Sequence, residues 1–142
     1  MAASSKAVIA LVALVIALSG CLFRSSDDLE AYHRYNECGH AGCFNRLRSH
    51  EKTSVFFGAM EIHPPDLSIE EGLADQSIEY LLSLKKEIET RGGSYEAYSF
   101  VSAVKIKRQR GGITDEQMAE MDLPGFCRDR GDIYNMCDFF QR

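Results

Sequence analysis

Cysteines are the residues of this 142-residue chain whose type and spacing could do chemistry. Cys21 stands alone near the N-terminus, and four others follow: Cys38, Cys43, Cys127 and Cys137. In an oxidising compartment, four thiols form two disulfides in any of three connectivities. Glycines between the members of each close pair favour local pairing. The long-range pairings would close far longer loops, and each such bond would stabilise by about 4 kcal/mol or more in the chain-entropy model. The sequence leaves both arrangements open.

Metal binding is the competing chemistry for the same cysteines. Cys38, His40 and Cys43 lie close together in the sequence, and His33 and His50 flank them. Their spacing matches neither a zinc ribbon nor a haem attachment motif. Oxidised sulfurs are also poor metal ligands, because the thiolate is the ligating form. We therefore expect disulfides, with no metal and no cofactor.

Catalytic signatures are missing from the sequence. It contains no Gly-x-Ser-x-Gly elbow, no His-Glu-x-x-His and no phosphate-binding glycine loop. Cys38 beside His40 has the composition of a nucleophile and its base, but a disulfide would remove the nucleophile. We therefore expect a protein that is not an enzyme.

The N-terminus has the pattern of an export signal. Lys6 supplies positive charge, and Ala7–Ala17 is an uninterrupted apolar run. This run is shorter than the roughly 20 residues that span a bilayer. Leu18-Ser19-Gly20-Cys21 follows it and resembles the lipobox of bacterial lipoproteins. The alternative is an ordinary secretory signal with an incidental cysteine.

The resemblance implies a lipid-anchored protein of the bacterial envelope. Residues 1–20 would be the removed signal peptide, and Cys21 would carry the fatty acids, palmitate among them. Residues 21–26 would form a lipidated tether. Because Leu22 replaces the aspartate that commonly retains lipoproteins on the inner membrane, the resemblance implies an outer-membrane location facing the periplasm.

The charge of the mature chain bears on its partners. Removal of residues 1–20 leaves 122 residues, with 15 basic and 21 acidic side chains. A net negative charge argues against nucleic acid as a partner, and it is compatible with a cationic protein. Contact with the membrane is expected through the lipid anchor alone.

Residues 27–142 are predicted to form one helical domain. Apolar residues recur every three or four positions between glycine- or proline-marked breaks. The fold class is therefore all-α, a small disulfide-bonded bundle of five or six helices. Val55-Phe56-Phe57 fits helix or strand equally well, and His63-Pro64-Pro65 ends whatever precedes it. Helices are expected at about 27–37, from 42, at 68–91, at 94–110, from 114 and at 132–141.

Capping patterns define several of these helices. Ser68 with Glu71, and Thr114 with Gln117, have the spacing of capping boxes. Ser94 is the expected cap of the helix at 94–110. Gly92-Gly93 should end the long helix at 68–91, and Leu123-Pro124-Gly125 should turn the chain.

Three charged motifs invite functional interpretation. Lys105, Lys107, Arg108 and Arg110 form a basic cluster that we expect to bind helix-terminal carbonyls or to face solvent rather than phosphate. Arg130-Gly131-Asp132 is an integrin-type tripeptide, for which an ordinary turn is the expected role. The acidic stretch from Glu61 to Glu79 fits a solvated helix start or a docking site for a cationic partner. Its candidate partner-binding residues are Glu70, Glu71, Asp75 and Glu79.

Two functions are compatible with these features. The first is an envelope lipoprotein that binds another protein, for example an immunity or inhibitor protein against a secreted toxin acting in the periplasm. The second is an accessory lipoprotein of a secretion, pilus or outer-membrane complex. Electrostatic complementarity would serve the first by speeding encounter with the partner.

Overall fold

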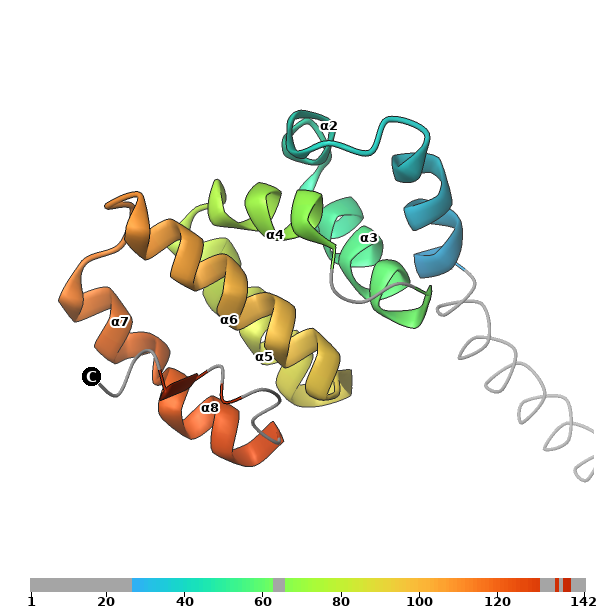
Figure 1. Cartoon of the computed structure of the whole chain (residues 1–142). Helices are drawn as coiled ribbons and strands as arrows, with labels where there is room; N and C mark the ends of the chain where they lie inside the picture. Colours follow the sequence, from blue (N-terminus) through green and yellow to red (C-terminus); the bar gives the residue numbers. More distant parts are fainter. Residues whose placement is uncertain (1–26, 63–65, 131–134, 136, 139–142) are drawn as a thin grey trace, which may run out of the picture.

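The computed structural model describes residues 27–62, 66–130, 135 and 137–138. Helices make up most of this part of the chain, and it contains no strand, which confirms the all-α class (Figure 1). A first helical segment, residues 27–36, precedes seven bounded helices, more than the five or six expected. These are α2 (Ala41–Asn45), α3 (Ser49–Ile62), α4 (Leu67–Ala74), α5 (Ile78–Arg91), α6 (Ser94–Gln109), α7 (Asp115–Met121) and α8 (Leu123–Arg130).

Helix α6 is the centre of the bundle. It packs against α3, α4, α5 and α8, and Figure 1 shows α5 running alongside it. Phe100, Val101 and Val104 bury their side chains almost completely in these contacts. The first helical segment, α2 and α3 gather at one end of the molecule (Figure 1). Val55-Phe56-Phe57, ambiguous in sequence, is a buried part of α3.

The long helix predicted at 68–91 is wrong at its beginning. Asp66, not Ser68, caps α4, because its carboxylate accepts hydrogen bonds from the backbone N–H groups of Ser68 and Ile69. The Ser68 hydroxyl also donates to Asp66 Oδ1, at 2.7 Å. Ser68 therefore lies in the first turn, and the predicted capping box with Glu71 does not form.

The same prediction is also wrong in its middle, where the chain forms two helices. Helix α4 ends at Ala74, and Ser77 caps α5 by accepting from the Tyr80 N–H. Lys107 of α6 donates to the carbonyl oxygens of Ala74 and Gln76, at 3.1 and 2.6 Å. A side chain distant in sequence thus satisfies the carbonyls that the break leaves open, which local periodicity does not reveal.

The remaining helix boundaries are partly as predicted. Thr114 and Gln117 form the expected capping box. Gly93 is the N-cap of α6 in place of Ser94, whose hydroxyl donates to the Arg130 carbonyl instead. The prediction of a turn at Leu123-Pro124-Gly125 is wrong. The chain turns one residue earlier, at Asp122, whose φ is 45°, and α8 begins at Leu123. Proline is tolerated in the first turn of a helix, where its missing N–H costs nothing.

Both disulfides are local. Cys38 pairs with Cys43 and Cys127 with Cys137, with Cα–Cα distances of 6.4 and 6.3 Å that suit a disulfide. Gly39, at a φ of +68°, makes the turn that lets the chain return from Cys38 to Cys43. The long-range pairings that the sequence left open are therefore excluded.

Several predictions fall outside the described residues. They are the signal peptide and lipobox within 1–21, the tether at 21–26, the His63-Pro64-Pro65 break, Gly131-Asp132 of the tripeptide, and most of the helix at 132–141.

Gly58 provides a stability prediction for the contact between the first helical segment and α3. A Cβ at this position would overlap the Asp28 carbonyl group and lie 2.9 Å from Tyr32 Cβ. We expect Gly58→Ala to lower the free energy of unfolding by about 1–3 kcal/mol, the usual cost of overpacking. Urea denaturation measures this loss, with His50→Ala, at an exposed position of the same helix, as a contrasting variant. Unchanged stability of Gly58→Ala would contradict the close packing.

Candidate functional site

The structure buries one of the four acidic residues predicted to bind a partner. Glu70 is only 7 % exposed, so the structure removes it from any docking surface. Asp75 is ion-paired with Arg110 and also accepts a hydrogen bond from Asn45. Glu71 is half-buried on α4, and Glu79 is exposed on α5. A helix period of 3.6 residues separates neighbouring carboxylates of the stretch onto different faces.

Glu70 has an unusual environment of its own. Its carboxyl group packs between α4 and α6 and accepts a hydrogen bond from the Ser99 hydroxyl, at 3.3 Å. Burial raises the pKa of Glu70 from its ordinary 4.5 to about 7, the nearby Asp66 adds to the rise, and the Ser99 hydrogen bond opposes it. Glu70 is therefore a pH-dependent element of the core.

The basic cluster is used within the fold. Lys107 donates hydrogen bonds to carbonyl oxygens at and just after the end of α4. A role in binding helix-terminal carbonyls was expected, but these carbonyls belong to α4 and the break after it, whereas Lys107 lies in α6. Arg108 pairs with Asp115 and Arg110 with Asp75. Three of the four basic residues therefore make contacts within the fold, and the absence of a phosphate site stays a prediction.

A hollow lies between the first helical segment and α3. We call it the disulfide cleft, because the Cys38–Cys43 bond lies at its edge, and its volume is about 660 Å³. Four apolar side chains, Ala31, Tyr35, Leu47 and Val55, line its floor. Charged and polar side chains of both signs surround them. These include Asp27, Arg34, His50 and Glu51.

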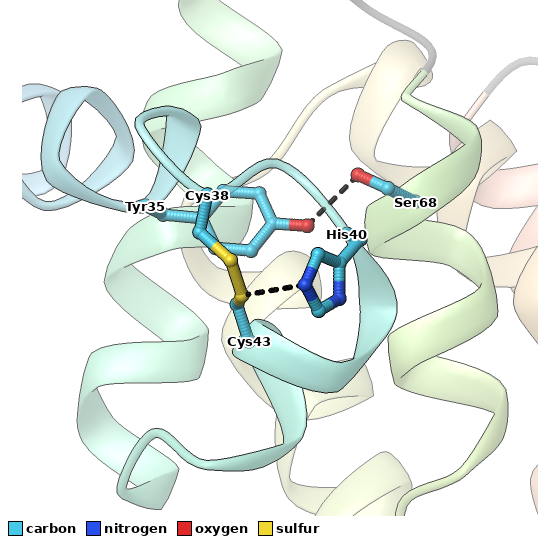
Figure 2. The surroundings of a disulfide bond; sticks show 5 residues. All are labelled: Tyr35, Cys38, His40, Cys43 and Ser68. Atoms are coloured by element: carbon cyan, nitrogen blue, oxygen red, sulfur yellow. Dashed lines mark hydrogen bonds between the residues drawn. A yellow bond between two sulfur atoms is a disulfide. The ribbon is translucent and has the colours of Figure 1, made fainter.

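Tyr35 joins the cleft to α4 (Figure 2). Ser68 uses its only proton on Asp66, so the Tyr35 hydroxyl is the donor in its 2.8 Å hydrogen bond with Ser68. Burial raises the pKa of Tyr35, which keeps the hydroxyl protonated. The Tyr35 ring also packs edge-on against Phe44 of α2. The wall of the cleft is therefore attached to the core.

His40 lies beside the disulfide at the edge of the cleft (Figure 2). Its Nε2 is 3.2 Å from Cys43 Sγ. The sulfurs of Cys38 and Cys43 and a ring nitrogen of His40 all lie within 4.8 Å of one another. This is the arrangement of three metal ligands, but the two sulfurs are bonded to each other, so neither is a thiolate. That no metal binds here stays a prediction.

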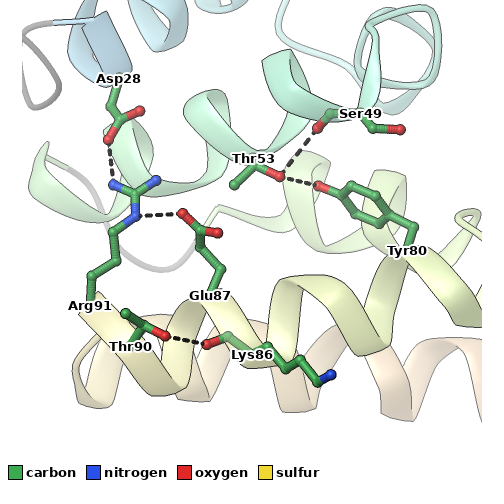
Figure 3. A network of polar contacts seen from close by, with 8 residues as sticks. All are labelled: Asp28, Ser49, Thr53, Tyr80, Lys86, Glu87, Thr90 and Arg91. Carbon is green, nitrogen blue, oxygen red and sulfur yellow. Dashed lines mark hydrogen bonds and ion pairs between the residues drawn. The ribbon is translucent and has the colours of Figure 1, made fainter.

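A second hollow, which we call the Arg91 depression, adjoins the cleft. Its volume is about 320 Å³, and it shares Asp27 and Ser54 with the disulfide cleft. Arg91 is bound there by Asp28 at 2.7 Å and Glu87 at 3.0 Å (Figure 3). Its guanidinium group also lies 3.7 Å from the centre of the Phe57 ring. The ion pair ties the first helical segment to α5.

A second polar link fixes α3 to α5 (Figure 3). The Thr53 hydroxyl donates its only proton to the Ser49 carbonyl. The Tyr80 hydroxyl is therefore the donor in its 3.1 Å hydrogen bond with Thr53. Burial raises the pKa of Tyr80 to about 12. This link braces α3, which contributes Val55 to the disulfide cleft, against α5, which contributes Glu87 and Arg91 to the Arg91 depression.

Sequence reasoning missed both hollows and anticipated only one part of them. Cys38, His40 and Cys43 were singled out by their spacing, and the structure brings them together. Asp28 lies at the start of the helix predicted at 27–37 and Arg91 at the end of the one predicted at 68–91, and nothing in the sequence pairs residues so far apart. The sequence held one signal for this region, the adjacent Phe57 and Gly58. Gly58 lets the first helical segment approach α3 closely, and the Phe57 ring packs against Arg91.

Comparison with protein-family models, with curated proteins and with solved structures finds no match to this chain. Within the described ranges, no helix has the length and apolar character required to cross a bilayer.

Proposed function

We propose that the protein is a lipid-anchored binding module of the bacterial cell envelope. In this proposal, the disulfide cleft and the Arg91 depression together receive a segment of a protein partner. The observation that carries it is the recessed surface along the first helical segment, with an apolar floor and a charged rim. Apolar centres with polar rims are typical of protein interfaces.

The extent of this surface favours a peptide segment over a small molecule. The disulfide cleft alone has the volume of an ordinary small-molecule site. Because it shares Asp27 and Ser54 with the Arg91 depression, the recessed surface extends from Cys38 to Arg91. An elongated surface of this kind suits a helix or an extended loop of a partner.

The position of the anchor supports the same proposal. Asp27 lies six positions after Cys21, and an extended chain of that length reaches only about 20 Å. Lipidation of Cys21 would therefore keep the cleft close to the membrane surface. The finer proposal is that the partner is a secreted toxin acting in the periplasm, which the protein neutralises as an immunity or inhibitor protein.

The test is partner capture with a cleft variant. Ala31 is half-buried in the disulfide cleft, so Ala31→Arg places a long charged side chain there without removing a core residue. We expect a stoichiometric partner of the lipidated wild-type protein to bind this variant at least tenfold more weakly, a loss of about 1.4 kcal/mol. Quantitative mass spectrometry of affinity-purified envelope material measures it.

The matched control is Glu79→Lys, on the exposed face of α5. It should retain the partner, because Glu79 lies outside both hollows. Absence of any stoichiometric partner, or a partner lost with Glu79→Lys and kept with Ala31→Arg, would overturn the proposed site. The finer proposal requires in addition that deletion of the gene sensitises cells to the captured protein.

A further inference from the structure

The two disulfides differ in their accessibility. Cys127 and Cys137 are 2 % and 1 % exposed and belong to the hydrophobic core. Cys38 is exposed and Cys43 is half-buried at the edge of the disulfide cleft. A thiol in solution can therefore reach Cys38, whereas the core shields the other bond.

The Cys38–Cys43 disulfide also has a hydrogen-bond donor beside it. His40 Nε2 lies 3.2 Å from Cys43 Sγ (Figure 2). A ring N–H at this distance stabilises a neighbouring thiolate.

We propose that Cys38–Cys43 is a redox-active disulfide that exchanges with thiols, and that Cys127–Cys137 is a structural one. The substrate class is a thiol, either a dithiol protein or a small thiol such as glutathione. This activity goes beyond the proposed partner binding and does not require it, because Cys38 is open to solvent as well as to the cleft.

The geometry assigns each sulfur its part in the exchange. The substrate thiolate attacks the exposed Cys38 Sγ and forms a mixed disulfide with it. The bond between Cys38 and Cys43 breaks, and its electron pair leaves with Cys43 Sγ. His40, in the tautomer with the proton on Nε2, donates a hydrogen bond to the departing thiolate. A better-stabilised leaving thiolate departs faster.

A second thiolate completes the reaction. It attacks the substrate sulfur of the mixed disulfide, and the Cys38 sulfur leaves as a thiolate. The substrate dithiol loses two electrons and two protons and becomes a disulfide. Cys38 and Cys43 take up the same two electrons and two protons and become thiols.

The experiment is reduction of the folded, detergent-solubilised protein by glutathione. Free thiols are alkylated at timed intervals, and mass spectrometry assigns them to each cysteine pair. We expect Cys38–Cys43 to be reduced at least tenfold faster than Cys127–Cys137, because access controls the exchange. In a Cys43→Ser variant, the free Cys38 thiolate should attack oxidised glutathione, form a mixed disulfide with one glutathionyl group and release the other as reduced glutathione.

Substitutions of His40 separate the effect of its hydrogen bond on the reduction rate from the effect of solvent access to Cys38. His40→Ala should slow reduction of Cys38–Cys43 by about tenfold, since a hydrogen bond to a charged atom is lost. His40→Gln retains a donor and should recover part of the rate. His33→Ala, an exposed histidine outside both hollows, is the matched control and should react like wild type. Equal reduction rates of the two disulfides, or a rate unaffected by His40→Ala, would overturn the proposal.

Discussion

A Cys21→Ser variant, exported behind a cleavable signal without a lipobox, should appear in the soluble periplasmic fraction, while the wild-type protein remains in the membrane pellet. The reason is that the proposed attachment depends on the acyl chains on this one sulfur. Each buried methylene contributes about 0.8 kcal/mol, and stable anchoring requires more than one chain or signal. Loss of all acyl chains should therefore release most of the protein. Fractionation followed by immunoblotting measures the change.

The matched control for this prediction is Leu22→Ser with the native signal, which alters the neighbouring residue and keeps the sulfur. It should stay with the membranes. If Cys21→Ser pellets as wild type does, the protein is held by something other than a lipid on Cys21, and the anchor proposal fails.

Glu70→Gln should make the protein more stable than wild type by about 3 kcal/mol at pH 8. Burial raises the pKa of Glu70 from 4.5 to about 7, so the folded protein favours the protonated carboxyl. Between these two pH values, the folded state holds more protons than the unfolded state, and the stability of wild type falls as pH rises. Below about pH 4.5, both states are protonated and the penalty disappears. Glutamine is neutral at every pH, so its profile lacks this fall.

Urea denaturation at pH 4, 6 and 8 measures this effect. Ser99→Ala is the informative companion, because Ser99 donates to the Glu70 carboxylate and opposes the rise in its pKa. It should be less stable than wild type at pH 8, in the direction opposite to Glu70→Gln. A Glu70→Gln variant that is less stable than wild type at pH 8, or whose pH profile parallels that of wild type, contradicts the buried position of this carboxyl.

The sequence predicts the elements of this fold better than their boundaries. The all-α class follows from helical periodicity, and the Thr114–Gln117 capping box forms as predicted because both partners lie within one turn. The break between α4 and α5 was not predictable in the same way. It depends on Lys107, a residue of α6 more than thirty positions from the carbonyls it binds.

The candidate site shows the same limit. Cys38, His40 and Cys43 are close in sequence, so their meeting in space could be predicted. The disulfide cleft forms only if the first helical segment packs on α3. One contact that holds this segment in place is the ion pair of Asp28 with Arg91 of α5, and these residues are 63 positions apart. Within the acidic stretch, Glu70 faces the core, because adjacent positions of a helix point in different directions. Partner binding by Glu71, Asp75 and Glu79 stays a prediction.

The most direct test of the account is the intact mass of the protein extracted from envelope membranes. The account predicts a chain that begins at Cys21, carries acyl groups on that residue, and contains two disulfides among Cys38, Cys43, Cys127 and Cys137. A chain that retains residues 1–20, or one that begins at Cys21 with an unmodified thiol, would contradict it.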